Sequence, residues 1–190
     1  MTGQAAPVIV AASHNPWLSQ GDIFSSVLIV RAGVSQAVAT QGIARGPALL
    51  ISHGCAIDKK TNSGRSKLEY LSFLPLQSVA ELEEQSAGNL RRSAVDPTLR
   101  PFEAFYLGEV PSVGESYVML TQPFTLPADF FRPELQPFTA EDTGDAEDTR
   151  PVPAMGDTRV GQLTEDAVGV FSRKWAIQWT RRDIVLDDEA

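Results

Sequence analysis

The segment "GDIFSSVLIV", Gly21 to Val30, decides the fold class of this sequence. It is rich in Ile, Val and Phe and follows a Gln-Gly turn signal, which is typical of a β-strand. We expect "SQAVATQG" (residues 35–42) to return beside it through a turn around Gly33. The apolar run "PALLIS", Pro47 to Ser52, is short and predicts a central, buried strand. The chain therefore opens as a β-sheet.

Three later segments extend this sheet. "KLEYLSFLPL", Lys67 to Leu76, alternates in polarity, and Pro75 is expected to end the strand or to put it on an edge. "FEAFYLGEV" and "SYVMLTQPF" are strand-like, with residues 111–114 as their link. Their aromatic residues are expected in the core or on a sheet face. These residues are Phe102, Phe105, Tyr106, Tyr117 and Phe124.

Two helices are predicted around these strands. Ser78 and Glu81 have the spacing of a capping box, which begins a helix over "SVAELEEQSAGNLRR". The last helix, residues 163–182, has Thr164 at its N-cap. Val168, Phe171, Trp175 and Trp179 recur at helical spacing, so this face either packs on the sheet or is an exposed partner surface, and we expect packing.

Composition indicates one domain over residues 1–190, because 43% of the residues are hydrophobic. We expect a barrel core over 18–132 and a Pro-rich, acidic loop over 133–158. The net charge is −8, but nine acids lie in residues 141–148 and 183–189, so the remainder is nearly neutral. Such a chain is not a bulk nucleic-acid binder, because phosphate affinity comes largely from Lys and Arg.

Several classes of protein are excluded by what the sequence lacks. No run approaches the roughly 18 to 20 apolar residues of a membrane helix, and no base precedes the N-terminal apolar run "APVIVAA", so we expect neither a membrane span nor a signal peptide. A single cysteine fits the reducing cytoplasm. The nucleotide-binding and zinc motifs are absent, and with two histidines we expect no metal or other cofactor.

A polar cluster, "SHGCAIDKK", follows the buried strand and is the candidate site. His53 carries the side-chain type that titrates near neutral pH, so it is a candidate acid or base, or else it caps the end of a strand. Cys55 is either a thiol activated by His53 or a small buried hydrophobe. A metal held by His53, Cys55 and Asp58 lacks an obvious fourth ligand.

Two segments resemble the MazF/PemK (Kid) toxins. "QGDIF" followed about twenty residues later by "ARGPALLIS" is similar to the Gly-Asp strand and Arg-Pro turn that open that family, and the likeness covers about residues 18–80. The arginine is displaced by one residue, as Arg45-Gly46-Pro47. The family's catalytic Thr or Ser falls on Gln77 or Ser78.

The resemblance implies an SH3-like β-barrel, here with a long acidic loop and a C-terminal helix. It also implies a homodimer, a metal-independent endoribonuclease acting on single-stranded RNA, and an antitoxin partner. Arg45 would stabilise the negative charge of the phosphorane, and His53 would act as base or acid. Asp58 would either orient His53 or act with it as the second proton-transfer group. Bound RNA would contact Gln77 and four basic residues at the end of the cluster and after it, Lys59, Lys60, Arg65 and Lys67. Alternatively, these basic residues form a solvated loop with no role in binding.

A second function remains open on the same barrel. The chain is then a non-catalytic interaction protein, such as an inhibitor or a phage or mobile-element factor that acts on a host protein. This alternative explains the acidic segments, which can mimic nucleic acid or occupy a basic surface of a partner. It also explains the missing catalytic Thr.

Overall fold

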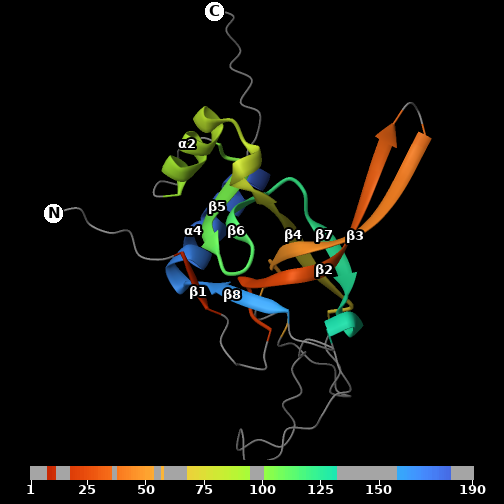
Figure 1. Cartoon of the computed structure of the whole chain (residues 1–190). Helices are drawn as coiled ribbons and strands as arrows, with labels where there is room; N and C mark the ends of the chain where they lie inside the picture. Colours follow the sequence, from red (N-terminus) through yellow and green to blue (C-terminus); the bar gives the residue numbers. More distant parts are fainter. Residues whose placement is uncertain are drawn as a thin grey trace, which may run out of the picture.

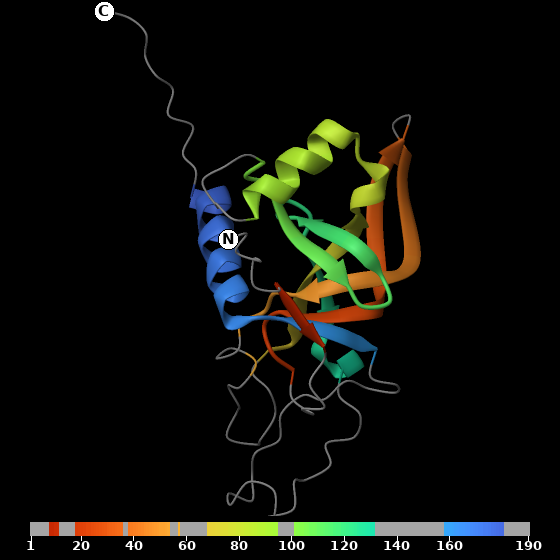
Figure 2. The same ribbon diagram turned by 60° about the vertical axis from the view of Figure 1, so that its left-hand side comes forward.

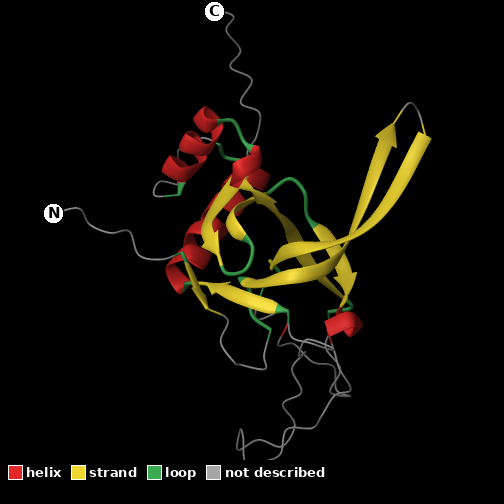
Figure 3. Ribbon diagram, viewed as in Figure 1, coloured by secondary structure: helices red, strands yellow, loops and turns green. Residues whose placement is uncertain are grey.

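The computed structural model describes residues 8–11, 18–35, 38–53, 57, 68–94, 101–131 and 158–180. These residues are mainly β, with two α-helices and two short 3-10 helices (Figure 3). The strands are β1 (Ile9–Ala11), β2 (Asp22–Ser35), β3 (Val38–Leu50), β4 (Tyr70–Ser78), β5 (Ala104–Val110), β6 (Gly114–Met119), β7 (Phe124–Pro127) and β8 (Arg159–Leu163). The helices are η1 (Val79–Glu81), α2 (Glu84–Ser93), η2 (Ala128–Phe131) and α4 (Glu165–Thr180).

The described strands form one antiparallel sheet that curls into a nearly closed barrel. Its strand order is β1-β8-β2-β3-β4-β6-β5, and β7 pairs with the first half of β4. The two ends of this order meet, because β1 also lies against β5 (Figure 1). The expected mainly β, barrel-like architecture is therefore confirmed. Two of its strands, β1 and β8, lie outside residues 18–132, where we placed the barrel core.

The central strands are buried on both faces. In β2, Ile23 packs in one apolar cluster and its neighbour Phe24 in another. Leu49 and Leu50 of β3 divide between the same two clusters. Successive strand residues point to opposite faces, so burial on both sides requires a continuous apolar run. This explains "ALLI" and confirms the buried strand expected there.

A long ribbon extends from the barrel. β2 pairs with β8 only over Asp22–Phe24, and β3 pairs with β4 only over Ala48–Leu50. Beyond these points Val27–Ser35 pairs, among the described strands, with Val38–Gly46 alone. Val27 and Ile29 at the base of this ribbon are buried in the core, whereas its outer part stands away from the barrel (Figures 1 and 2). The turn expected around Gly33 was wrong, because the pairing continues to Ser35 opposite Val38.

Pro75 does not end its strand. β4 continues to Ser78 and pairs with β3 on one side. On the other side it pairs with β7 over Tyr70–Phe73 and with β6 over Leu76–Ser78. Pro75 lies between these two ladders, where the partner strand changes and a missing N–H is tolerated.

The helix expected from Ser78 begins later than the sequence indicates. The Ser78 hydroxyl does accept a hydrogen bond from the Ala80 N–H, at 3.3 Å, but this caps the 3-10 turn η1. Leu82 is extended, and α2 begins only at Glu84. The prediction that Ser78 caps a helix was therefore right, but the prediction that this helix is α2 was wrong, because Ser78 caps η1.

At the C-terminal side, α4 confirms the last expected helix. Thr164 caps it, because its hydroxyl accepts from the Ala167 N–H at 3.2 Å. Phe171 is buried against Phe105 of β5, with ring centroids 5.4 Å apart. The expected packing holds for Phe171, whereas Trp179 is 57% exposed. The strand β8, directly before this helix, was not predicted. Apart from Thr158, the expected acidic loop lies outside the described residues.

Candidate functional site

Arg45 lies in β3, at the base of the ribbon, opposite Leu28 of β2. Its side chain is exposed. His53 is also exposed and lies three residues beyond the end of β3, where its carbonyl oxygen accepts from the Ile57 N–H at 3.1 Å. Both residues are accessible to a ligand.

Arg45 and His53 are connected by the second half of β3 and a short extension of it. The strand pairing continues past β3, because the Ile51 N–H donates to the Ser72 carbonyl and the Ser72 N–H to the Ser52 hydroxyl. At about 3.3 Å per residue, on the order of 20 Å of extended chain separates Arg45 from Ser52. The other expected members of this site lie outside the described residues: Cys55, Asp58, Lys59, Lys60, Arg65 and Lys67.

The Gly-Asp pair that opens the resemblance has a structural role here. Gly21 has φ +96°, a left-handed conformation that favours glycine. The buried Asp22 accepts from the Ser19 N–H at 2.8 Å and lies 3.6 Å from the Arg159 guanidinium of β8. This pair therefore fixes the turn into β2 and joins β2 to β8.

Gln77, the expected substrate contact that lies among the described residues, lines a cavity. It lies near the end of β4, and its Nε2 donates to Oε1 of Gln122, 45 residues later, at 3.0 Å. Both amides line a groove of about 710 Å³ between α2 and the β4–β6–β5 part of the sheet, which we call the α2 groove. Its described lining comprises Gln77, Leu82, Ser86, Asn89, Leu90, Pro101, Phe102, Glu103, Ala104, Tyr117, Met119 and Gln122.

The α2 groove lies beside the contact between α2 and the sheet, because only one side of the helix packs on the strands. Ala87 and Leu90 are buried against Ala104 of β5 and Tyr117 of β6. The exposed Ser86 lines the hollow beside that contact. Tyr117 is mostly buried, and burial together with the charge of Glu81 raises its pKa, so the groove contains a neutral phenol.

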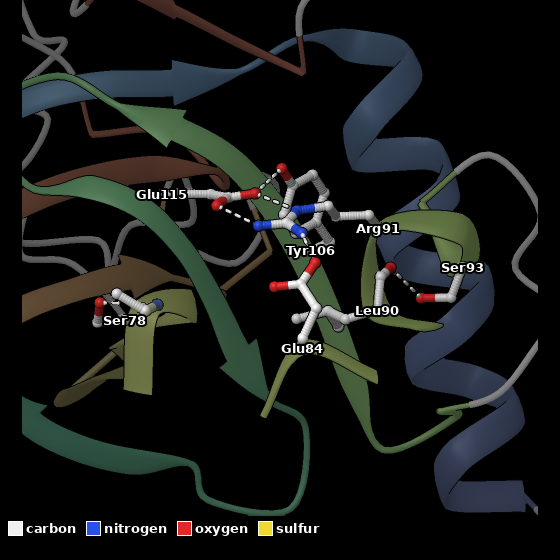
Figure 4. A network of polar contacts seen from close by, with 8 residues as sticks. Ser78, Glu84, Leu90, Arg91, Ser93, Tyr106 and Glu115 are labelled. Carbon is white, nitrogen blue, oxygen red and sulfur yellow. Dashed lines mark hydrogen bonds and ion pairs between the residues drawn. The ribbon is translucent and has the colours of Figure 1, made fainter. Parts of the chain in front are cut away.

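An ion pair fastens the outer side of α2 to the sheet (Figure 4). Arg91 donates through Nε and Nη2 to the two carboxylate oxygens of Glu115 in β6, each at 2.7 Å. The Tyr106 hydroxyl donates to the same carboxylate at 2.6 Å. Hydrogen bonds from Arg91 and then Tyr106 lower the pKa of Glu115 to about 2. Burial and the Glu115 contact raise the pKa of Tyr106 to about 12.

A buried lysine lies beneath the last turn of α2. Lys174 of α4 is 1% exposed, and its Nζ donates to the Ser93 hydroxyl at 3.2 Å. That hydroxyl donates to the Leu90 carbonyl at 2.8 Å, near the negative end of the helix dipole. Burial lowers the pKa of Lys174 to about 8, against the opposing effect of Glu103. The helices α2 and α4 are therefore joined by the buried ammonium group of Lys174, which has little access to water.

Comparison with known proteins adds no family to this description: no protein-family model and no curated protein matches the chain. Among the described residues there is no group of three or more His, Cys, Asp or Glu placed to hold a metal ion. The same part of the chain contains no helix with the length and apolar character needed to cross a membrane.

Sequence reasoning missed most of the α2 groove. Phe102 and Tyr117 were expected only as core or sheet-face residues, and Glu103 was not singled out. Gln77 was found through the resemblance. The signal that could have found the others is the placement of α2 over β5 and β6, which depends on tertiary packing.

Proposed function

We propose that the chain is a non-catalytic interaction protein on an SH3-like barrel, and that its partner binds in the α2 groove. The observation that carries this proposal is the groove itself. Its volume of about 710 Å³ lies within the range of about 300–1,000 Å³ typical of binding sites. It combines aromatic and aliphatic surface with a few amides, the mixture that binding sites use for affinity and orientation.

The positions of Arg45 and His53 also favour binding over catalysis. A proton-transfer group and the cation that stabilises the developing charge must act on the same phosphate, within hydrogen-bond reach. Arg45 lies within β3, whereas His53 lies three residues beyond its end, and the chain between Arg45 and Ser52 has a contour length on the order of 20 Å. An interaction protein requires no such convergence.

Blocking the groove tests this proposal. Ser86 lines the groove and is exposed, so Ser86→Trp fills it without disturbing the core. Gln85 is its exposed neighbour on α2 and is not among the lining residues, so Gln85→Trp is the matched control. We expect random-sequence pentapeptides on an array to bind the wild type and Gln85→Trp but not Ser86→Trp. Equal peptide binding by all three proteins would remove the groove from the function.

The second candidate is a MazF/PemK-like, metal-independent endoribonuclease that acts on single-stranded RNA, as a homodimer controlled by an antitoxin. Two observations favour it: Arg45 and His53 are both exposed, and Gln77 lines a groove.

A cleavage assay separates the two candidates. The wild type and the Arg45→Ala/His53→Ala variant are each incubated with a long single-stranded RNA in EDTA. Our proposal predicts intact RNA with both proteins while circular dichroism shows them folded. Discrete cuts by the wild type alone would establish the endoribonuclease instead.

A further inference from the structure

We infer that the partner segment bound in the α2 groove is an extended peptide that places an arginine or lysine beside Glu103; this inference rests on the proposed function. Glu103 precedes β5 and is the one charged residue among the described residues that line the groove. The other lining residues carry amides, a hydroxyl, aromatic rings or aliphatic groups. A cationic ligand thus meets a carboxylate, whereas a phosphate meets no cation in the lining.

The surroundings of the groove are also acidic. Glu81 and Glu83 are exposed along the chain between β4 and α2, and the charge of Glu81 reaches Tyr117 inside the groove. Glu84 lies at the start of α2, 3.7 Å from Arg91. Complementary charge of this kind selects partners and speeds their association.

Among the described residues of α2 and α4, three bases lie near the groove, and each already has a polar partner. Arg91 is held by both oxygens of Glu115. Arg92 donates to the Asn89 side-chain oxygen. Lys174 is buried and donates to Ser93, and it also interacts with the charge of Glu103. Because Lys174 is buried and already bonded, the exposed carboxylate of Glu103 remains open to a ligand from solvent. The described residues around the groove set five carboxylates against these three cations, so their balance of charge is negative; the carboxylates are Glu81, Glu83, Glu84, Glu103 and Glu115.

The aromatic lining suits a cation as well. Phe102 is half-buried directly before Glu103, and Tyr117 lines the same groove. A guanidinium or ammonium group within about 6 Å of an aromatic ring is attracted to the ring face, most strongly where water is excluded. An arginine side chain can therefore lie along these rings and direct its charged end to Glu103.

The amides of the groove fit a peptide backbone. Gln77 and Gln122 share one hydrogen bond, from Nε2 to Oε1. A side-chain amide has two donors and one acceptor, so the pair retains the carbonyl oxygen of Gln77 and the amino group of Gln122 for a ligand. One acceptor and one donor together complement the N–H and C=O of a peptide unit. This favours an extended segment over an isolated cation.

The test compares arginine with citrulline, its neutral isostere. Fluorescein-labelled equimolar mixtures of acetylated pentapeptides, with a fixed central arginine, citrulline or glutamate, are titrated with the protein and followed by fluorescence anisotropy. We expect an apparent Kd about 10-fold lower for the arginine mixture than for the citrulline mixture, the effect of one charge-assisted contact. Glutamate should bind most weakly.

Two variants assign the effect to Glu103. Glu103→Gln should bring the arginine mixture to the affinity of the citrulline mixture. Glu109→Gln, an exposed residue of β5 outside the groove lining, should leave the 10-fold preference unchanged. Ser86→Trp should abolish binding of all mixtures, whereas Gln85→Trp should not.

The outcomes separate this inference from the proposed function. Equal affinity for arginine and citrulline, abolished by Ser86→Trp, would overturn the cationic partner while the groove remains a binding site. A preference for arginine that survives Glu103→Gln would remove Glu103 from recognition. If no peptide mixture binds, or if Ser86→Trp does not reduce the binding that is seen, both proposals are overturned.

Discussion

Arg91 of α2 and Glu115 of β6 form an ion pair with two parallel hydrogen bonds of 2.7 Å, and this pair joins the helix to the sheet. The α2 groove lies between the same helix and the same part of the sheet. The geometry of the binding surface therefore depends on a contact outside the groove. Both side chains are partly exposed, so we expect the contact to position α2 more than to stabilise the whole fold.

Glu115→Gln tests this role. The amide cannot accept both hydrogen bonds from Arg91, so we expect faster amide hydrogen exchange across α2 with only a small fall in the midpoint of thermal unfolding. Acid should act on the wild type in the same way. The contribution of this carboxylate is present above its unfolded pKa of about 4.5 and is lost as the pH falls through about 2. Glu69→Gln, at an exposed position directly before β4, is the control. Unchanged exchange in α2 at neutral pH would contradict this role.

Lys174 makes stability depend on pH in a second, alkaline range, because here burial disfavours the charged form. Its pKa is lowered by burial to about 8 in the folded chain, from 10.5 in the unfolded chain. Between these values the unfolded chain binds more protons, so this group makes stability rise with pH from about 8 to about 10. Lys174→Met should abolish that rise, which urea denaturation at several pH values can measure.

At pH 7 the same Lys174→Met substitution should stabilise the chain by about 1 kcal/mol or more, because an apolar side chain replaces a buried charge. Arg173→Met, at the exposed neighbouring position of α4, is the matched control and should change little. A Lys174→Met protein that is less stable than the wild type at pH 7 would show that the Ser93 contact outweighs the cost of burying the ammonium group.

Two glycines test the junction of β2, β8 and α4. At Gly21 an added Cβ would lie 3.0 Å from the Leu163 side chain, and the backbone has φ +96°. Gly21→Ala should therefore destabilise the chain by about 1–3 kcal/mol. At Gly169, in α4, an added Cβ meets nothing within 4 Å, so Gly169→Ala should stabilise by up to about 1 kcal/mol. Similar unfolding midpoints for the two variants would contradict the described junction.

The ribbon should be dispensable for the barrel. From Val27 to Ser35 the strand β2 pairs only with β3 among the described elements. Replacing residues 30–43 with Asn-Gly keeps the Ile29–Ala44 pair and closes it with a turn that suits a two-residue hairpin. We expect this shortened chain to give the same near-ultraviolet circular dichroism and cooperative unfolding as the wild type. Loss of cooperative unfolding would show that the ribbon supports the core.

Local patterns predicted much of the fold. "ALLI" indicated a buried strand, because apolar residues on both faces leave few other structures, and the alternation of "KLEYLSFLPL" indicated another strand. The strand β8 was not predicted, because "RVGQL" is short and mixed in polarity. Its position in the sheet also depends on pairing with β2, more than 130 residues earlier. The separation of η1 from α2 was not predicted, because a serine such as Ser78 can cap either a 3-10 helix or an α-helix.

The candidate site was less accessible to sequence reasoning. A short motif can indicate residues that act together in one loop, such as those after Ser52. The α2 groove combines residues from β4, α2, β6 and the segments before β5 and after β6, and the Gln77–Gln122 contact joins positions 45 residues apart. The spacing of these residues in the sequence does not indicate that they meet, because tertiary packing brings them together in space.

The central claim is that the α2 groove binds the partner, and shift mapping by nuclear magnetic resonance tests it most directly. The ¹⁵N-labelled full chain is titrated with the arginine-centred pentapeptide mixture. We predict that the largest amide shift changes occur at Phe102, Glu103, Tyr117 and Gln122, and that Ser86→Trp abolishes them. Shift changes that instead centre on Arg45 and His53, or none at all at saturating peptide, would contradict the claim.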